Sequence, residues 1–572
     1  MKTNYFTSFD EKNIFYRSWN YDKNKKTIVV IHRGHEHSER LDDFANNEKF
    51  RLYNVFSYDL RGHGYTEIES SPVFMDYVRD LEYFIRHIKN EYQIDEKNIF
   101  IVANSIGGVI ATTWVNYYTP KISGMALLAP AFKIRLYVPL AKEFISLMVK
   151  IHNKSKVPSY VKAKVLTHDK IEQKKYNEDR LITKDINAKL LLGVLDYGER
   201  MVRKASTISI PTMIFSAEKD YVVAHKEQKI FYVNLSSELK EFVMLKNTYH
   251  GIIFEENRNE VFEKIENFIM KSFDSKVSEI NILPNIDSIR EYDSIIVKNI
   301  STLEKISFGI QKKSLNKLGC LSGGMNIGLA HGFDSGPSLD YIYKNKASGK
   351  FLVGKLLDKF YLNQTGWKGI RERKKNLLTL IREKILSSHK KDLKILDVAG
   401  GVGNYLFDIK EEFPDVEIVI NEIKLENIQI GEKIIKSRQW CNVRFTNFDC
   451  FDIENYKKLE FIPDIVIVSG IFELFGDNKM LDQTIKGISQ IISPDGVIIY
   501  TGQPEHPQLK QIAFVLNNHR SGDWIMRIRS QQELDNIFLY NGYDKKEILV
   551  DNEGIFTVSL VQRSSDNKDV SL

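Results

Sequence analysis

The stretch Asn98–Thr113, NIFIVANSIGGVIATT, decides the fold of the first half of the chain. Its apolar run predicts a buried strand, Ser105 follows at the end of that run, and two glycines open a helix-like segment. The pattern G-x-S-x-G is typical of a nucleophilic serine on a sharp strand-to-helix turn, and here Ala103 replaces the first glycine. Because alanine adds only a methyl group, we expect the turn to form.

Further apolar runs on both sides of this unit predict the other strands of one sheet. They are TIVVIH (Thr27–His32), YNVFSYDLRGHG, GMALLAPA and PTMIFSAEKD, and they alternate with helical runs such as Asp76–Tyr92. Near-continuous apolar strands are typical of a parallel sheet that helices cover on both faces. We therefore expect an α/β fold for the first half.

A second strand–helix series follows, since a chain of 572 residues is too long for one core. It begins with LKILDVAGG and continues through VEIVINE, VRFTNFD, PDIVIVSG and DGVIIYTG to GIFTVSLVQ. The series predicts a second α/β domain. The expected boundaries are residues 1–274 for the first domain, 275–309 for a linker, 310–389 for a helical lead-in, 390–565 for the second domain and 566–572 for a tail.

Composition excludes several classes of protein. A net charge of +6 is mild for this length, so we expect no nucleic-acid partner. Cys320, Cys441 and Cys450 form no C-x-x-C pair, which argues against a disulfide framework and a structural zinc site. The start lacks the apolar core of a signal peptide, and no apolar stretch is long enough to span a bilayer. We expect a cytoplasmic protein, with a peripheral contact at the inner face of the membrane left open.

Two residues downstream of Ser105 can complete a nucleophilic site. A serine becomes a nucleophile when a histidine accepts its proton, and a carboxylate orients that histidine. Asp220 follows the strand-like run PTMIFSA, and His250 follows the next run, KEFVMLK. The order Ser, Asp, His is that of α/β-hydrolases. The alternative for each residue alone is a surface aspartate and a structural histidine.

The oxyanion of an acyl-transfer intermediate needs two backbone N–H groups. Ile106 follows the nucleophile, and Gly34 is the best candidate in the loop after the first strand. The same loop contains His32, His35 and His37, which raise a metal site as an alternative. No distant partners with metal-ligand spacing stand out, so we expect no metal.

An insertion at about 132–207 interrupts the first strand series. Its runs VPLAKEFISLMVKIH and INAKLLLGVLDYGERMV have apolar residues at helical spacing. We expect a helical cap over the site. Its apolar face suits an acyl chain or a membrane surface, and packing on the sheet is the alternative.

The second half contains a glycine-rich turn, Asp397-x-x-x-Gly401-x-Gly403, between a strand and a helix. The dinucleotide pattern and the P-loop both fail here, so neither cofactor is predicted. Glu422 ends the next strand and can bind two ribose hydroxyls; Asp449 follows the third strand and can accept from an adenine amino group. The alternative is an adenine-nucleotide fold with another cofactor, or one that has lost binding.

The first half resembles the monoacylglycerol lipase and lysophospholipase group of α/β-hydrolases. The resemblance rests on HRGHEHSER, YDLRGHGYTE, ANSIGG, SAEKDYVV and YHGIIFE, in the family's order. It implies a Ser105–Asp220–His250 triad, with Gly34 and Ile106 as the oxyanion hole. There are two departures: arginine stands at position 33 where the family has glycine, and ANS replaces Gly-His-Ser.

The second half resembles Rossmann-like class I methyltransferases that use S-adenosyl-L-methionine. GFDSGPSLDYIY, GWKGIRERK, VSGIFELF, YTGQPEHPQL and WIMRIRS further resemble a bacterial methyltransferase family that is often fused behind a lipase-type hydrolase. The resemblance implies that Asp397, Gly401 and Gly403 flank the methionine part, Glu422 the ribose and Asp449 the adenine.

Together these patterns predict a bifunctional enzyme: a serine hydrolase for a lipid-like ester, and a methyltransferase whose acceptor is unidentified. Candidates for a base in methyl transfer are Glu473, Glu505 and His506, and candidates to close over the cofactor are Tyr341 and Tyr361; the alternative for each is a surface role. Two alternatives stay open for the whole chain: only one domain is active, or both form a non-catalytic scaffold at a membrane.

Overall fold

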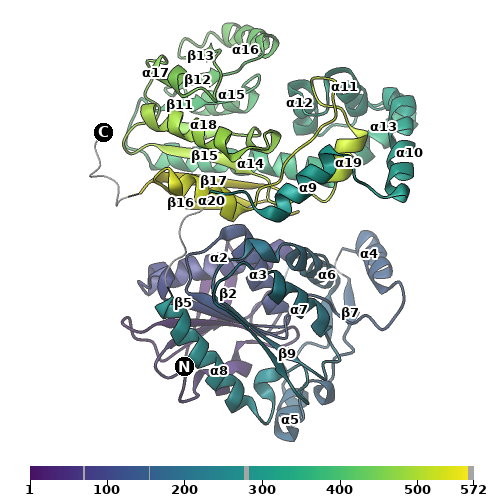
Figure 1. The fold of residues 1–572 in the computed structure, drawn as a ribbon, viewed down its shortest axis with the longest axis vertical. Coiled ribbons are helices and arrows are strands. Elements are labelled where there is room, and N and C mark those ends of the chain that lie inside the picture. The colour runs from purple at the N-terminus through teal and green to yellow at the C-terminus, as the bar shows by residue number, and fades with distance from the viewer. Residues whose placement is uncertain (68–70, 154, 276–281, 565–572) are drawn as a thin grey trace. The chain divides into compact units, whose positions relative to one another are not determined.

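The computed structural model describes residues 1–67, 71–153, 155–275 and 282–564. The chain divides into two compact units, Met1–Ser278 and Glu279–Leu572 (Figure 1). The predicted tail, 566–572, lies outside the described residues, as does most of the junction between the units. Within the described part, no helix is both long and apolar enough to cross a membrane.

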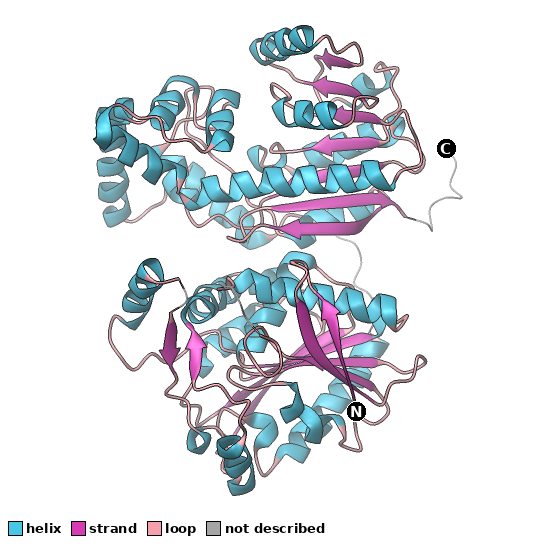
Figure 2. Cartoon of the chain, turned by 180° about the vertical axis from the view of Figure 1, so that it is seen from behind, coloured by secondary structure: helices cyan, strands magenta, loops and turns pink. Residues whose placement is uncertain are grey.

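The first unit is built on an eight-stranded sheet (Figure 2). In spatial order the strands are β1 (Lys2–Thr7), β2 (Asn13–Trp19), β4 (Asn54–Tyr58), β3 (Thr27–Ile31), β5 (Ile99–Asn104), β6 (Gly124–Leu128), β9 (Thr212–Ala217) and β10 (Lys240–Leu245). The strands from β4 to β10 pair in parallel, whereas β1 and β2 pair antiparallel and form one edge. The predicted parallel α/β sheet is confirmed, and the β1–β2 edge is an addition that the sequence did not indicate.

Helices cover both faces of this sheet. They are α2 (Phe74–Glu91), α3 (Ile106–Tyr118), α7 (His225–Asn234) and α8 (Arg258–Asp274). Every residue of α3 is buried, which explains why its sequence contains no charged side chain. The helix that follows Ser105 is therefore a rigid part of the core.

The predicted cap contains three helices and a two-stranded ribbon. These elements are α4 (Ala141–Ile151), β7 (Lys156–Pro158), α5 (Lys170–Glu178), β8 (Asp185–Asn187) and α6 (Ala188–Arg203). A Cβ atom at Gly198 of α6 would lie 2.6 Å from the carbonyl oxygen of Phe132, so this helix packs tightly on the first unit. In α4, by contrast, only Ile145 is buried, so α4 is held less firmly than α6.

The second unit is built on a seven-stranded sheet. In spatial order the strands are β13 (Val443–Thr446), β12 (Glu417–Asn421), β11 (Lys394–Asp397), β14 (Ile465–Val468), β15 (Val497–Gly502), β17 (Thr557–Arg563) and β16 (Tyr543–Val550). The first five pair in parallel, and β17 pairs antiparallel with both of its neighbours. Covering helices are α14 (Thr365–Ser387), α15 (Asn404–Glu412), α16 (Leu425–Arg438), α18 (Asn478–Ile491) and α20 (Gln531–Tyr540). The predicted Rossmann-like fold is confirmed.

A group of helices lies beside one end of this sheet (Figure 1). They are α9 (Ile286–Ile296), α10 (Thr302–Leu318), α11 (Gly323–His331), α12 (Gly336–Lys344), α13 (Phe351–Leu362) and α19 (Leu509–Val515). The described part of the expected linker, 282–309, contains α9 and the start of α10.

Helix α9 is fixed to the second unit by a buried arginine. Arg527 donates hydrogen bonds to Ser288 of α9 at 3.2 Å and to Asn478 at 2.8 Å. It also pairs with Glu533 at 2.5 Å, and the side chains of both members of this ion pair are almost fully buried. These partners lie some 200 residues beyond α9 in the sequence, so side chains far along the chain hold this helix in place.

Replacement of Arg527 by alanine should destabilise the second unit, because it removes the close partner of the buried Glu533 and leaves only Arg529, at 3.8 Å, to balance that charge. The expected loss in free energy of unfolding is about 3–5 kcal/mol. Urea unfolding followed by circular dichroism measures it. Arg290→Ala is the matched control, since Arg290 lies on α9 but its side chain is 77% exposed. Equal midpoints for the two variants would contradict the role given to Arg527.

Candidate active site and cofactor cradle

Ser105 occupies a strained turn between β5 and α3. Its φ is 52° and its ψ is −114°, a backbone conformation that few residues other than glycine adopt. Its backbone N–H donates to Leu128 O at 2.9 Å, and its carbonyl accepts from Ala131 N at 3.0 Å. Leu128 is the last residue of β6 and Ala131 comes just after it, so the neighbouring strand holds the serine in this conformation.

Close packing around the turn explains its small residues. A Cβ atom at Gly107 would lie 2.8 Å from Ile31 Cγ2 and 2.9 Å from the carbonyl oxygen of His32. Ala103 is fully buried yet fits between β3 and β6, so its methyl group is accommodated. Asn104, which replaces the usual histidine, donates to Ile31 O at 3.1 Å and ties the end of β5 to β3. The turn therefore forms without its first glycine.

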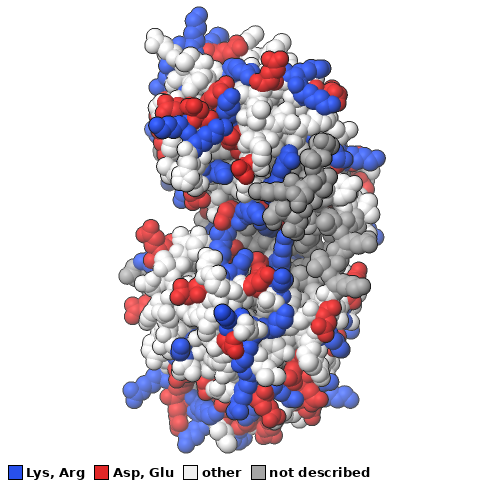
Figure 3. Space-filling view, turned by 90° about the vertical axis from the view of Figure 1, so that its left-hand side faces the viewer, with Lys and Arg blue, Asp and Glu red and all other residues white. Residues whose placement is uncertain are grey.

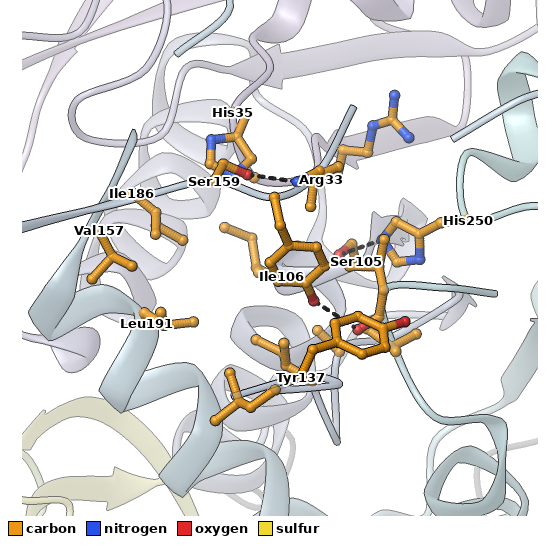
Figure 4. A pocket seen from close by; sticks show the side chains of 18 of the residues that line it. Arg33, His35, Ser105, Ile106, Tyr137, Val157, Ser159, Ile186, Leu191 and His250 are labelled. Atoms are coloured by element: carbon orange, nitrogen blue, oxygen red, sulfur yellow. Dashed lines mark hydrogen bonds between the residues drawn. The ribbon is translucent and has the colours of Figure 1, made fainter. Parts of the chain in front are cut away.

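The structure brings Ser105, His250 and Asp220 together. His250 Nε2 lies 2.8 Å from Ser105 Oγ (Figure 4). On the other side of the ring, His250 Nδ1 lies 2.8 Å from Asp220 Oδ2. Because an ionised carboxylate only accepts hydrogen bonds, Nδ1 carries the proton and Nε2 can accept one from the serine. All three residues are buried. This arrangement is suited to deprotonating the serine hydroxyl.

Asp220 is held as an anion. Burial alone raises its pKa, but the contact with His250 and two backbone N–H groups outweigh burial, and its pKa lies below the ordinary value. Those donors are Val222 N at 2.7 Å and Val223 N at 2.9 Å, both to Oδ1. They leave Oδ2 for His250, so the carboxylate can orient the imidazole and stabilise its charged form.

Gly34 and Ile106 lie next to each other beside Ser105. A Cβ atom at Gly34 would lie 3.3 Å from Ile106 Cδ1, and both residues line the same cavity as Ser105 and His250. Ile106 is the first residue of α3, where a backbone N–H has no partner within the helix. The positions suit an oxyanion hole.

The cavity at Ser105 has a volume of about 330 Å³ and is lined mainly by apolar side chains. Cap residues form much of its wall, among them Tyr137, Val157, Ile186 and Leu191 (Figure 4). The volume lies within the range of small-molecule sites. The cap thus encloses an apolar space directly in front of the serine.

Arg33, which replaces a family glycine, does not fill this cavity. Figure 4 shows its guanidinium pointing away from the cavity. The group pairs with Glu36 at 2.7 Å and lies over the Phe254 ring at 5.0 Å. The arginine therefore stabilises the loop that carries Gly34 and leaves the space beside Ser105 open.

The three histidines of that loop have separate partners. His32 Nδ1 lies 2.7 Å from Arg33 O, and its Nε2 accepts from Leu60 N at 2.9 Å. His35 Nδ1 lies 3.2 Å from Thr183 Oγ1. Burial lowers the pKa of His35 to about 4, so this side chain is neutral at pH 7. His37 Nε2 lies 2.8 Å from Asp179 Oδ2. Among the described residues, no three potential ligands gather as a metal site would require.

In the second unit, the glycine-rich turn follows β11, near the middle of the sheet. Gly401 has φ of 59° and Gly403 has φ of 83°, so both need glycine's conformational freedom. A Cβ atom at Gly403 would lie 2.4 Å from Ile420 Cδ1. At Gly401 the nearest atom to such a Cβ is Glu422 Oε2, at 4.0 Å. The turn is therefore open on the side that faces the Glu422 carboxylate.

Asp397 ends β11 and is fully buried. Burial raises its pKa to about 7, against the lowering effect of a hydrogen bond from Tyr405. Asp449 lies beyond β13; its side chain is exposed and accepts from Phe451 N at 3.0 Å. Because β11, β12 and β13 are neighbours, the predicted cofactor residues follow adjacent strands at one edge of the sheet.

These residues fit S-adenosyl-L-methionine. The open side of Gly401 gives room for a ligand against the backbone, and Glu422 offers a carboxylate for ribose hydroxyls. Asn404, at the start of α15, donates to Asp340 of α12 at 2.6 Å, so the helical lead-in reaches over the turn. A ligand held here would be shielded from water by that helix.

A second cavity, of about 580 Å³, lies in the same unit, and none of the predicted cofactor residues is among those that line it. Gly470, which follows β14, lines the cavity. Strand β14 pairs with β11, so the cavity opens at the same sheet edge as the glycine-rich turn. Its walls are mainly apolar and include Phe333, Trp367, Trp524 and Phe556. Its position suits the binding of a methyl acceptor.

The candidate bases and closing residues separate into two groups. Glu473, His506 and Tyr361 line the second cavity. Glu505 and Tyr341 are not among its lining residues. Tyr341 instead donates a hydrogen bond to the carboxylate of Asp358 within the helical lead-in.

Sequence reasoning missed Arg373, whose Nη1 pairs with Glu473 Oε1 at 3.2 Å. Both side chains are almost fully buried, and both line the second cavity. Arg373 lies on α14, far from Glu473 in the sequence, so no local motif could indicate the pair. The arginines in GWKGIRERK were the available signal.

Comparisons with known proteins also divide the chain into two parts. A family model described as "Putative methyltransferase" matches residues 265–563, and one described as "Serine aminopeptidase, S33" matches residues 22–257. "Uncharacterized protein YnbC" of Escherichia coli is 37% identical over 574 residues, and the alignment covers 98% of each chain.

The first unit has additional relatives. The monoglyceride lipase of Rattus norvegicus is 25% identical over 272 residues, which cover 46% of this chain and 88% of the lipase. A solved structure of a monoacylglycerol lipase from Paleococcus ferrophilus is 20% identical, with a TM-score of 0.41, and the match covers 45% of this chain and 99% of that one.

The tight contact at Gly107 predicts unequal effects of two small changes at the turn. Gly107→Ala should displace Ser105 and cost about 1–3 kcal/mol of stability. Labelling by a fluorophosphonate probe should slow roughly 10²-fold, as expected for an atom misplaced by about 1 Å.

Ala103→Gly is the control, because it restores the glycine of the usual pattern without adding an atom. We expect it to retain labelling, with a stability loss of roughly 0.5–1 kcal/mol. Time courses of labelling and thermal unfolding measure both effects. Normal labelling in Gly107→Ala would show that the close approach does not position the serine.

Proposed function

Because the chain belongs to the family described as "Putative methyltransferase" and begins with a lipase-like α/β-hydrolase domain, we propose that it is a bifunctional enzyme. The first domain hydrolyses a lipid-like carboxylic ester. The second transfers a methyl group from S-adenosyl-L-methionine to an unidentified acceptor, and the mainly apolar second cavity supports a lipid-related one. The observation that carries the first activity is the continuous contact of Ser105, His250 and Asp220.

In the proposed hydrolysis, His250 accepts the proton of Ser105 as the serine oxygen bonds to the ester carbonyl carbon. The N–H groups of Ile106 and Gly34 hold the resulting oxyanion. The bond to the alcohol then breaks, and the alcohol leaves with the proton from His250. Water repeats the sequence on the acyl-enzyme, which releases the acid and restores the serine.

The proposed ester has a long apolar acyl chain and a small headgroup, as in a monoacylglycerol or a lysophospholipid. The apolar cavity in front of Ser105 and the curated monoglyceride lipases among the relatives support this class. Tyr137 and Val138 of the cap line this cavity and are largely exposed, and Leu140 and Phe144, at the start of α4, are exposed beside them, which suits delivery of an acyl chain from a lipid phase.

Ser105→Ala should abolish fluorophosphonate labelling and lower ester hydrolysis by roughly 10⁴–10⁶-fold, since removal of the nucleophile leaves only binding and the oxyanion hole. Hydrolysis of a long-chain monoacylglycerol, measured by fatty-acid release, checks this. Glu422→Ala is the control, because it changes only the second domain. If wild-type protein is not labelled although folded, the hydrolase proposal fails.

For methyl transfer, Asp397 and the turn at Gly401 and Gly403 would hold the methionine part of the cofactor, Glu422 its ribose and Asp449 its adenine. When bound, S-adenosyl-L-methionine supplies an electrophilic methyl group on a sulfonium. The chain's own contribution is to align an acceptor in the second cavity and exclude water. His506 lines that cavity and is the proposed base where the acceptor must lose a proton.

Glu422→Ala should weaken the binding of S-adenosyl-L-methionine roughly 10–100-fold, because hydrogen bonds to a charged group contribute about 1.5–3 kcal/mol. Isothermal titration calorimetry measures the affinity. Glu426→Ala is a matched control, since Glu426 is an exposed glutamate one turn further on, in α16. Equal affinities for both variants would remove Glu422 from the proposed site.

The two tests also separate the remaining alternatives. A chain with one active domain would pass one test and fail the other, and a scaffold would fail both. The triad contacts favour an active hydrolase, and the open cradle at Gly401 favours a bound nucleotide cofactor.

A further inference from the structure

Helices α10 and α13 of the second unit expose an unusual number of large apolar side chains. These are between 56% and 83% exposed and comprise Leu303, Ile306, Ile310, Phe351, Leu352, Val353, Leu356 and Phe360. No residue of α10 is buried. Both helices pack against the short helix η6 (Gly319–Leu321), and Figures 1 and 2 both show them side by side. We call these eight residues the α10–α13 surface.

The charges that the two helices carry are mostly positive, and Lys312 alone of their lysines has an acidic neighbour among the ion pairs of the described residues, Asp523 at 4.0 Å. The two helices carry six exposed lysines: Lys305, Lys312, Lys313, Lys317, Lys355 and Lys359. Their acidic residues are Glu304, which pairs with Lys510, and Asp358, which is fully buried within hydrogen bonds. By contrast, basic and acidic side chains are interspersed over the face that Figure 3 shows.

The surface is continuous with the second cavity. Ile310, Leu318 and Phe360 line that cavity and are also exposed, at 61%, 48% and 67%. Leu315 and Leu357 extend the apolar lining inward from the same two helices. The proposed acceptor cavity therefore opens to solvent between apolar side chains that are flanked by lysines.

We propose that the α10–α13 surface docks on an anionic lipid bilayer, so that the second cavity receives a long-chain lipid from that bilayer. Apolar side chains of interfacial helices insert at the boundary between headgroups and acyl chains, and flanking lysines bind anionic headgroups. The assignment of the lipid as methyl acceptor rests on the proposed function; the docking itself does not.

A second copy of the chain fits this surface less well. In a symmetric contact the same patch meets itself, so lysines of one copy would face lysines of the other. An anionic bilayer instead complements both the apolar residues and the positive charge around them. The two occupants differ in a measurable way, since one changes the mass of the protein and the other requires lipid.

The test is co-sedimentation of the full-length protein with vesicles of phosphatidylglycerol and phosphatidylethanolamine, and with vesicles of phosphatidylcholine alone. We expect binding to the anionic vesicles, weaker binding to the neutral ones and loss in high salt. Leu352→Ser with Leu356→Ser should weaken binding about tenfold or more, because less apolar area inserts. Lys355→Glu with Lys359→Glu should weaken it comparably.

Three controls keep the result interpretable. Leu386→Ser replaces an exposed leucine at the end of α14 and should bind as the wild type does. Leu140→Ser with Phe144→Ser measures any contribution of the hydrolase cap. Light scattering reports a second copy. The proposal is overturned if the wild type does not bind anionic vesicles, if only the cap variant loses binding, or if the α13 changes alter the mass of the protein and not its lipid binding.

Titration with S-adenosyl-L-methionine in the absence of lipid separates this proposal from the assignment of methyl transfer. Vesicle binding without cofactor binding would retain the docking surface and remove the methyltransferase activity. Cofactor binding without vesicle binding would do the reverse.

Discussion

The first unit depends on one close approach of backbone to backbone, where α3 leaves the sheet beside β3. There is room at this point for a hydrogen atom at Gly107 but not for a methyl group. The fully buried helix α3 cannot move away, so Ser105 is held in a left-handed conformation at its start. Asp220 follows β9 and His250 follows β10, and parallel pairing brings both to the same edge of the sheet. The contacts of the three side chains follow from this geometry.

The glycine-rich turn of the second unit is also closely packed, but it exposes backbone rather than a side chain. Gly400 and Gly403 pack against Ile420 of β12, so the turn after β11 is pressed onto the neighbouring strand. Gly401 lies on the other side of this turn and faces open space. In the first unit the tight turn presents a side chain, whereas in the second it presents bare backbone, which is what a bound nucleotide needs. One sheet architecture thus serves two kinds of chemistry.

Most of the fold could be predicted because its elements are locally encoded. The apolar runs of buried strands are visible in sequence, and so are the small residues of both turns. Helix α9 was not predicted, although Asn285 caps it and isoleucines recur along it. Its contacts are with distant segments: Arg527, more than 200 residues away, and the core cluster that contains Ile295. The β1–β2 edge was missed for a related reason: most of β1 is exposed and lacks an apolar run.

The candidate sites divide along the same line. Ser105, His250 and Asp220 each follow a recognisable strand, so order along the chain was sufficient to propose them. The second cavity is built from α10, α13, α14 and the segments after β14 and β15. Its ion pair joins Arg373 and Glu473, which lie 100 residues apart in the sequence, so no local pattern indicates it. Tyr341 donates its hydroxyl hydrogen to Asp358 within the helical lead-in, and its role beside the cofactor stays a prediction.

The buried carboxyl of Asp397 would link the binding of a cationic ligand to the ionisation of this group. With a pKa of about 7, this group is largely protonated in mildly acidic solution and largely ionised above neutrality. A cation that settles nearby favours the ionised form and expels the proton. If S-adenosyl-L-methionine binds here as proposed, its binding would release a proton, and its affinity would rise with pH until the carboxyl is fully ionised.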